Sequence, residues 1–260
     1  MTARDDSLSL PNGFFDRALT ARQLSDFAEC PHKFLLSHFV DRQATRRFLG
    51  GPAVLHHALR GAITELYREG MSPEGAERSL QELFEGLWEG DLCADTMEEE
   101  SLRRQGLQIL SDFAADWVVD NPTALHADLS LDGEVDSVKF AAVADLVFRP
   151  ENEGGPLRVI RAISSRRPPT RAELAQDISA GLLLLLAAEH FAPQVVEVSY
   201  YCLRPRKLRG VDMTTEQLDY LRRDLVSRVA RIRRERRFAP RKGKYCRWCR
   251  ARGWCEIWKR

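Results

Sequence analysis

The 260-residue sequence lacks an excess of one charge, because 39 Lys and Arg residues face 38 Asp and Glu residues. This balance excludes a uniformly basic, histone-like protein and a uniformly acidic mimic of a polyanion. The sequence also lacks repeats, low-complexity segments and long apolar runs. Its longest apolar stretch, Leu182–Ala188, is far too short to cross a bilayer. No run of signal-peptide length follows the first Arg, so we expect a soluble, cytoplasmic protein without a membrane partner.

The near-neutral total conceals an uneven distribution of charge. Acids dominate from Glu74 to Glu100, whereas residues 204–252 contain 18 Lys or Arg residues and five acids. A basic segment of this kind is typical of a protein that binds a polyanion, and Tyr245, Trp248 and Trp254 could stack on bases. A solvated face of an amphipathic helix is the alternative interpretation. The candidate DNA-binding residues are Arg228, Arg231, Arg233, Arg234, Arg236, Arg237, Arg241, Lys242 and Lys244.

Hydrophobic periodicity and helix caps predict a helical first half followed by a mixed α/β region. Strands are expected near residues 124–131, 137–148, 157–164 and 195–203. The capping box that begins at Thr170 predicts a helix to about His190, and a basic helix is expected from Thr214. The expected domains are an N-terminal extension (1–18), a helical lobe with Cys30 and His56 (19–122), a core (123–213), and a basic helix with a Cys-rich tail (214–260).

The six cysteines are more readily metal ligands than disulfide partners in the expected reducing compartment. Three of them share one short motif near the C-terminus: Cys246, Cys249 and Cys255. Cys30 is the best candidate for a fourth ligand because it directly precedes Pro31 at a joint between two predicted helices. An ordinary buried cysteine is the alternative interpretation of Cys30. Cys93 lies in an acidic loop, and Cys202 lies in a predicted strand.

The segment Leu19–Leu36, LTARQLSDFAECPHKFLL, resembles the opening motif of RecB-family PD-(D/E)XK nucleases. The four cysteines resemble the iron–sulfur staple of the AddB nuclease domain and of CRISPR-associated RecB-like exonucleases. The resemblance extends from Leu19 to Cys255. It implies a restriction-endonuclease-like α/β core, with a mixed sheet flanked by helices, and a 4Fe–4S cluster on four thiolates. Zinc is the competing metal, because four thiolates also suit zinc. The implied ligands are Cys30, Cys246, Cys249 and Cys255.

The same resemblance implies a nuclease site built from an early His, an Asp on the second core strand, an Asp/Glu-x-Lys pair on the third strand and a Gln-x3-Tyr motif on the next helix. His56, in GPAVLHHAL, matches the early His, with His57 as the alternative. Asp145, in AVADLVF, matches the metal-binding Asp. Such a site uses divalent cations to activate water and to stabilise the charge of the transition state.

The third strand departs from the family pattern. It reads VIRAIS, which puts Arg161 in the acid slot and Ile163 in the lysine slot. Residues 157–172 contain no Asp, Glu or Lys, so no shift of register supplies the missing pair. Two slots on the next helix are also changed: the Gln slot holds Ser179 and the Tyr slot holds Leu183.

A guanidinium in the acid slot changes the chemistry of the site, because it cannot deprotonate and it repels a divalent cation. Asp145 alone is not expected to hold a catalytic Mg²⁺ or Mn²⁺. We therefore expect Arg161 to form a buried ion pair with Asp145, unless a relocated carboxylate partly restores the site. The candidates for that carboxylate are Glu173 and Asp177, on the following helix.

Three functions compete at this stage. The first is a DNA-binding iron–sulfur protein with a catalytically degenerate nuclease fold, which acts as a binding or scaffold subunit beside a helicase or nuclease partner. Its DNA would be single strands or duplex ends. The second is an active Mg²⁺-dependent exonuclease or endonuclease with a relocated ligand. The third is a protein-binding module that uses the acidic helices between Glu74 and Glu100.

Overall fold

The computed structural model describes residues 10–39, 50–70, 73–150, 152–249 and 251–258. The chain forms two compact units. Unit 1 comprises Met1–Phe48, Gly133–Ala141 and Asp219–Arg260, and unit 2 comprises Leu49–Asp132 and Ala142–Leu218. The units do not coincide with the four consecutive segments expected from the sequence, because β2 (His126–Val135) and β3 (Val138–Phe148) each contribute residues to both.

Unit 1 combines helices with one short parallel strand pair, Leu19 with Phe140 and Thr20 with Ala141. A capping box at Thr20 begins the first helix, and the Thr20 side chain accepts a hydrogen bond from the backbone of Gln23. Cys30 is the extended residue between the first two helices. The elements are β1 (Leu19–Thr20), α1 (Ala21–Glu29), α2 (Pro31–Phe39), most of α9 (Thr215–Arg234), and the short helices η1 (Phe14–Asp16), η4 (Lys244–Trp248) and η5 (Glu256–Trp258).

Aromatic rings form much of the core of unit 1. Phe34 is fully buried and has ring contacts with Phe14, Phe27 and Phe238 at centroid separations of 5.7 to 6.1 Å. Helix α9 adds the apolar stripe that the sequence predicted. Its buried residues are Leu221, Leu225, Val229 and Ile232. The contacts of Phe238 show that the segment after α9 packs against α1 and α2.

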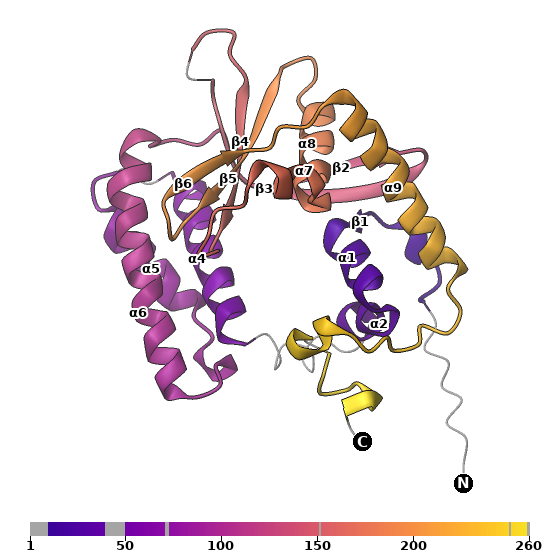
Figure 1. Cartoon of the computed structure of the whole chain (residues 1–260). Helices are drawn as coiled ribbons and strands as arrows, with labels where there is room; N and C mark the ends of the chain where they lie inside the picture. The colour runs from indigo at the N-terminus through magenta and orange to yellow at the C-terminus, as the bar shows by residue number, and fades with distance from the viewer. Residues whose placement is uncertain (1–9, 40–49, 71–72, 151, 250, 259–260) are drawn as a thin grey trace. The chain divides into compact units, whose positions relative to one another are not determined.

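Unit 2 contains a mixed sheet and the remaining helices (Figure 1). Strand β3 pairs antiparallel with β4, β4 pairs parallel with β5, and β5 pairs antiparallel with β6. Side chains from α4, α5, α6, β3, β4 and β5 form one hydrophobic core. The elements not yet given are α4 (Gly51–Arg68), α5 (Ala76–Leu87), η2 (Gly90–Leu92), α6 (Thr96–Phe113), the π-helical η3 (Ala114–Val118), β4 (Leu157–Ile163), α7 (Arg171–Gln176), α8 (Ile178–His190), β5 (Val196–Cys202) and β6 (Lys207–Gly210).

The mixed sheet flanked by helices confirms the expected restriction-endonuclease-like α/β class. Three details of the expected elements are wrong. The helix expected from Thr170 to His190 is interrupted at Asp177, whose extended backbone separates α7 from α8. Strand β2 does not end near residue 131 but continues to Val135, and the hairpin turns at Asp136 and Ser137, both with positive φ. Strand β6 was not expected. No helix among the described residues is long and apolar enough to span a membrane.

Candidate functional site

Asp145 is the fully buried acid of β3 in unit 2. Its Oδ1 accepts a hydrogen bond from Nε of Arg60, on α4, at 2.5 Å, and its Oδ2 accepts one from the backbone N–H of Ala162 at 2.8 Å. The paired register of β3 with β4 ends at Leu146 and Ile160. The backbone N–H of Ala162 lies beyond this paired stretch, and it donates to the carboxylate of Asp145. Both of its oxygens are therefore bonded within the protein.

Arg60 also reaches a second carboxylate. Its Nη2 donates to Oδ1 of Asp128 at 2.8 Å, so one guanidinium joins acids from β2 and β3. Asp128 has φ of 52°, which is unusual for a residue other than glycine. Arg68, further along α4, lies 3.4 Å from the other oxygen of Asp128. Sequence reasoning missed both Arg60 and Asp128. The position of Arg60 one helical turn after His56 was the only available signal.

Arg161 does not pair with Asp145, and this expectation was wrong. Its Nη1 instead donates to the backbone carbonyl of Val143 at 2.7 Å, and Arg60 forms the buried ion pair. The guanidinium of Arg60 can reach Asp145 from α4, whereas Arg161 bonds the backbone of the neighbouring strand. Ile163 is half-buried on the same strand, β4, and has no ionisable group to offer. The pair of slots on β4 is thus filled by a hydrogen-bonded cation and an aliphatic side chain.

His56 lies near this group of charges. Its Nδ1 is 3.3 Å from Oγ of Ser164, and the side chain is half-buried, whereas the alternative His57 is exposed. Burial, together with a smaller contribution from the neighbouring His57, lowers the pKa of His56 to about 4. His56 is therefore neutral at pH 7.

The two carboxylates proposed as relocated ligands serve as helix caps. Glu173 accepts hydrogen bonds from the backbone N–H of Thr170 and from the exposed Arg167, and these bonds lower its pKa to about 2. Asp177 accepts the backbone N–H of Ser179 at 2.7 Å at the start of α8. Leu183 is buried on the same helix. Neither acid has a hydrogen bond to Asp145 or to Arg60.

The residues around Asp145 do not fit a divalent cation in this arrangement. A guanidinium nitrogen already lies 2.5 Å from Oδ1, and Oδ2 is bonded to a backbone N–H. Among the residues that the structure describes, no three His, Cys, Asp or Glu side chains are arranged to hold a metal ion. A cation placed beside Asp145 would meet the permanent charge of Arg60.

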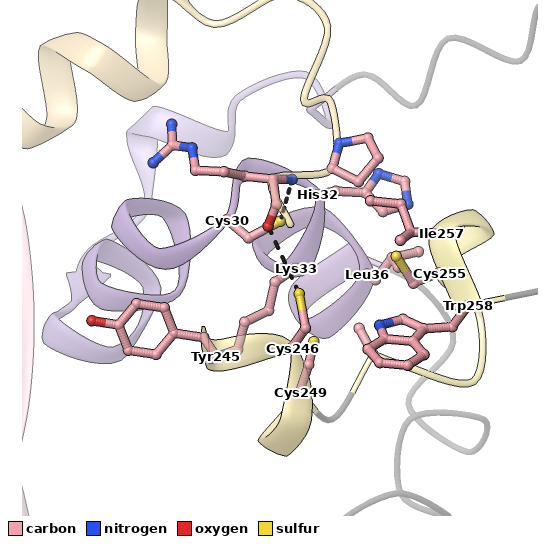
Figure 2. Close-up of a pocket in the computed structure, with 13 residues that line it drawn as sticks. Cys30, His32, Lys33, Leu36, Tyr245, Cys246, Cys249, Cys255, Ile257 and Trp258 are labelled. Atoms are coloured by element: carbon pink, nitrogen blue, oxygen red, sulfur yellow. Dashed lines mark hydrogen bonds between the residues drawn. The ribbon is translucent and has the colours of Figure 1, made fainter. Parts of the chain in front are cut away.

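A second candidate site is a pocket in unit 1, lined by residues of α2 and of the C-terminal segment (Figure 2). Four of its lining residues are the predicted metal ligands: Cys30, Cys246, Cys249 and Cys255. All four are free thiols of intermediate exposure. Figure 2 shows them around the same pocket, although Cys30 is more than 200 residues away from the other three in the sequence. Cys93 and Cys202 do not line this pocket.

The cysteine pocket suits a four-thiolate centre by the identity of its donors. The backbone N–H of Arg241 donates to Sγ of Cys30 at 3.2 Å, and that of Gly243 donates to Sγ of Cys246 at 3.4 Å. Hydrogen bonds to ligand sulfurs are typical of the surroundings of metal–thiolate sites. Burial raises the pKa of the Cys249 thiol, so metal binding there would release a proton. The sulfurs do not meet the arrangement needed for a single ion.

A charged network lies beside the cysteine pocket. Nζ of Lys33, which lines the pocket, is 2.7 Å from Oδ1 of the buried Asp26 and 2.5 Å from Glu29. His38 contacts the other oxygen of Asp26 at 2.9 Å. Burial alone would raise the pKa of Asp26, but hydrogen bonds from His38 and Lys33 lower it overall. This network holds the ammonium group of Lys33 at the edge of the pocket.

The basic residues of unit 1 differ in how far they are engaged within the protein. Arg228 is half-buried, and its Nε donates to Asp224 at 2.6 Å. Arg233 lies over the ring of Phe15, and Arg241 donates to the carbonyl of Ala28. The side chain of Trp248 lies outside the described part of the structure. The exposed basic residues are Arg231, Arg233, Arg234, Arg236, Arg237, Arg241, Lys242 and Lys244.

Comparison with known proteins decides the family. The family model described as the PD-(D/E)XK nuclease superfamily matches residues 18–256. The chain belongs to this superfamily. A crystal structure of a protein from Eubacterium rectale that is named as an exonuclease is 11% identical, with a TM-score of 0.49 over 93% of this chain and 92% of that one. The crystal structure of SSO0001 is 12% identical, with a TM-score of 0.35 over 91% and 95%. No curated protein matches.

One buried tyrosine close to these residues was not singled out from the sequence. Tyr200, on β5, pairs in register with Arg161 on β4 and is 5% exposed. Its hydroxyl has no hydrogen-bond partner in the described structure. Burial raises its pKa, and Asp177 raises it further. In the sequence, Tyr200 lies in an ordinary alternating strand, and nothing in that pattern distinguishes it from a core tyrosine.

Proposed function

We propose that this PD-(D/E)XK protein is a DNA-binding iron–sulfur protein whose nuclease centre is catalytically degenerate. It acts as a binding or scaffold subunit of a DNA-processing complex, beside a helicase or a second nuclease subunit. The single observation that carries this proposal is the state of Asp145. The acid that a nuclease of this fold needs for its metal ion is fully buried and bonded to Arg60 and to the backbone of Ala162.

The chemistry of the neighbouring strand supports the same conclusion. Metal-dependent cleavage needs a second carboxylate near Asp145 and a cation beside the attacking water. Strand β4 supplies Arg161 and Ile163 at these slots, and residues 157–172 contain no Asp, Glu or Lys. Glu173 and Asp177 form helix caps, and neither is hydrogen-bonded to Asp145. Among the described residues, these positions therefore do not supply the two or more protein ligands that metal-dependent cleavage requires.

The four cysteines of the pocket would hold a 4Fe–4S cluster in this proposal. Such a cluster would join α1 and α2 to the segment that follows α9, and its role would be structural. Loop closure supports this role, because a link from Cys30 to Cys246 closes a loop of about 216 residues and removes chain entropy equivalent to roughly 5 kcal/mol. Zinc is the alternative metal for the same donors. Iron analysis and the visible absorbance of anaerobically purified protein distinguish the two.

DNA binding would use the exposed basic side chains of α9 and of the segment that follows it. Phosphate contacts by Lys and Arg give binding that depends little on sequence and weakens steeply with salt. Tyr245, which is 46% exposed, and the other aromatic residues of this segment could add stacking on unpaired bases. The substrate in this proposal is single-stranded DNA or the end of a duplex.

An active Mg²⁺-dependent nuclease is the second candidate function. The observation that favours it is Asp128, a second carboxylate that shares the guanidinium of Arg60 with Asp145. For this candidate to hold, Arg60 would have to move away when the metal ion and DNA bind. Asp128 would then be the relocated ligand, in place of Glu173 or Asp177.

Cleavage assays of purified, cluster-loaded protein test the proposal. We expect no cleavage of single-stranded or duplex DNA with Mg²⁺ or Mn²⁺. The double variant Arg161→Asp/Ile163→Lys is expected to recover at most weak cleavage, because Arg60 still forms an ion pair with Asp145. If the unmodified protein cuts DNA, and Asp145→Ala abolishes that cutting, the second candidate is correct. Catalysis that persists in Asp145→Ala would indicate a contaminating nuclease.

A further inference from the structure

We infer that Arg60 is the resident cation of the degenerate nuclease centre. Its guanidinium lies between two carboxylates, where a divalent cation would otherwise join them. The inference rests on the proposal that the nuclease centre is degenerate. It adds a replacement for the lost metal ion and identifies Asp128 as the second acid of the centre. Removing Arg60 should then expose a latent divalent-cation site.

The geometry around Arg60 has the form of a bridge. Its Nε contacts Asp145 at 2.5 Å, and its Nη2 contacts Asp128 at 2.8 Å. The two acids come from different strands, β3 and β2, and are 17 residues apart in the sequence. Metal ions bound by carboxylates draw together acids from separate strands in the same way. A guanidinium offers five donors in a fixed plane and can satisfy two carboxylates at once.

The burial of Asp145 requires such a cation. An ionised carboxylate with no exposed surface is costly unless it is paired and hydrogen-bonded. Within the described residues, the groups bonded to Asp145 are Arg60 and the N–H of Ala162. Arg161 bonds to the carbonyl of Val143 and does not serve this purpose. Arg60 therefore neutralises the charge that a metal ion would neutralise in an active enzyme.

Asp128 is held in an unusual backbone conformation at this position. Its φ of 52° lies in the left-handed region, although it is part of the strand β2. Residues other than glycine adopt this region uncommonly, and contacts of the side chain help to maintain it. An irregularity of this kind in a strand redirects a side chain. Here the side chain reaches Arg60 and lies near Arg68.

Arg60→Ala provides the main test, with Mn²⁺ as the probe ion. The full-length protein is freed of divalent ions and titrated with MnCl₂ to about 10 mM, while thermal unfolding and the EPR signal of free Mn²⁺ are recorded. Wild-type protein is expected to bind no Mn²⁺ at this centre. The variant is expected to melt about 10 °C lower without metal, because a buried charge is left unpaired. Millimolar Mn²⁺ should raise its melting temperature by about 4 °C.

Two variants act as controls. Arg68→Ala lies on the same helix and near the same Asp128, but Arg68 is half-exposed and does not touch Asp145, so it should stay insensitive to Mn²⁺. Arg60→Ala/Asp145→Asn removes both charges of the buried pair. It should melt at a higher temperature than Arg60→Ala and lose the response to Mn²⁺. If Arg60→Ala is insoluble, recovery of soluble protein in this double variant supports the inference, and failure to recover contradicts it.

The inference is overturned if wild-type protein binds Mn²⁺ and Asp145→Asn abolishes that binding. It is also overturned if Arg60→Ala is as stable as wild type and silent to Mn²⁺. These results are independent of DNA binding, which is measured separately by titration of labelled single strands in metal-free buffer. Absence of DNA binding in wild type would contradict the proposed function and leave the assignment of Arg60 intact.

Discussion

The charged cluster around Asp145 in unit 2 and the cysteine pocket of unit 1 differ in how their polar groups are bonded. In the first, Asp145 has a protein partner at each oxygen, and Arg60 donates from two nitrogens to carboxylates. At the cysteine pocket, four thiols face a shared space, and Cys30 and Cys246 each receive one long backbone hydrogen bond. The oxygens of Asp145 are therefore already bonded within the protein, whereas the four thiols of the pocket could bind a ligand.

This difference in bonding supports the proposed roles of the two sites more directly than the identity of their residues does. Asp145 is of a residue type that binds metal ions, but its two oxygens are bonded to Arg60 and to the backbone N–H of Ala162. The four cysteines line one pocket beside Lys33, whose ammonium group is paired with Asp26 and Glu29. If the cysteines hold a metal centre as proposed, its removal should disturb unit 1 strongly, whereas chelation should leave the residues around Asp145 unchanged.

The largest effect is expected from Cys30→Ser. If the four cysteines share a metal centre, the change opens a loop of about 216 residues and should lower the free energy of unfolding by up to roughly 5 kcal/mol. Denaturant unfolding of anaerobically purified protein, with iron and zinc analysis, measures the effect. Cys93→Ser is the matched control, because Cys93 is also partly exposed but lies outside the pocket. Equal stability and equal metal content in both variants would contradict a shared centre.

A smaller effect is expected from acidification of the closed centre around Asp145. The pKa of His56 is about 4 in the folded protein and about 6.5 in the unfolded chain. Between these values the unfolded chain takes up a proton that the folded protein does not, so stability falls as the pH drops from 6.5 to 4. The contribution is at most about 3 kcal/mol and is complete below pH 4.

His56→Gln should flatten this part of the stability profile, as measured by denaturant unfolding between pH 4 and pH 7. His57→Gln is the comparison: it removes only the smaller contribution to the shift of His56, so it should flatten the profile much less. An unchanged slope in His56→Gln would mean that other groups produce the pH dependence. It would also contradict the interpretation that burial near Asp145 disfavours a positive charge on His56.

The fold could be predicted from the sequence because its signals are local. The capping boxes at Thr20 and Thr170 and the apolar stripe of α9 each fixed an element in the expected place. The break between α7 and α8 was missed, because Asp177 caps a second helix within one continuous apolar pattern. The turn at Asp136 and Ser137 was missed because Ser137 is not a typical choice for the second of two successive positive φ angles.

The site could be predicted only where sequence position determines it. The slots of Asp145, Arg161 and Ile163 follow from the resemblance of the two strand motifs, and β3 and β4 do pair as antiparallel neighbours. The partner of Asp145 depends on which cation can reach it through space, and a helix 85 residues earlier supplies that cation. Asp128 was hidden for a related reason, because a local backbone irregularity redirects its side chain.

The smallest effect is expected for the basic residues of unit 1. Here too, some side chains are bonded within the protein and others are exposed. Arg228 is half-buried and bonded to Asp224 at 2.6 Å, whereas Arg231 is exposed and forms no ion pair within the described part of the chain. If α9 binds DNA, Arg231→Ala should remove one phosphate contact. The slope of log affinity against log salt should fall by about 0.7 for single strands.

Arg228→Ala should leave that slope nearly unchanged, because its guanidinium is already committed to Asp224. Titration of a labelled single strand at four salt concentrations measures both variants against wild type. Denaturant unfolding of each variant serves as the control, since Arg228→Ala also removes an i,i+4 pair worth a few tenths of a kcal/mol. Equal slopes for the two variants would mean that this face of α9 does not contact phosphates, and any DNA contacts would then fall to the segment from Arg236 to Lys244.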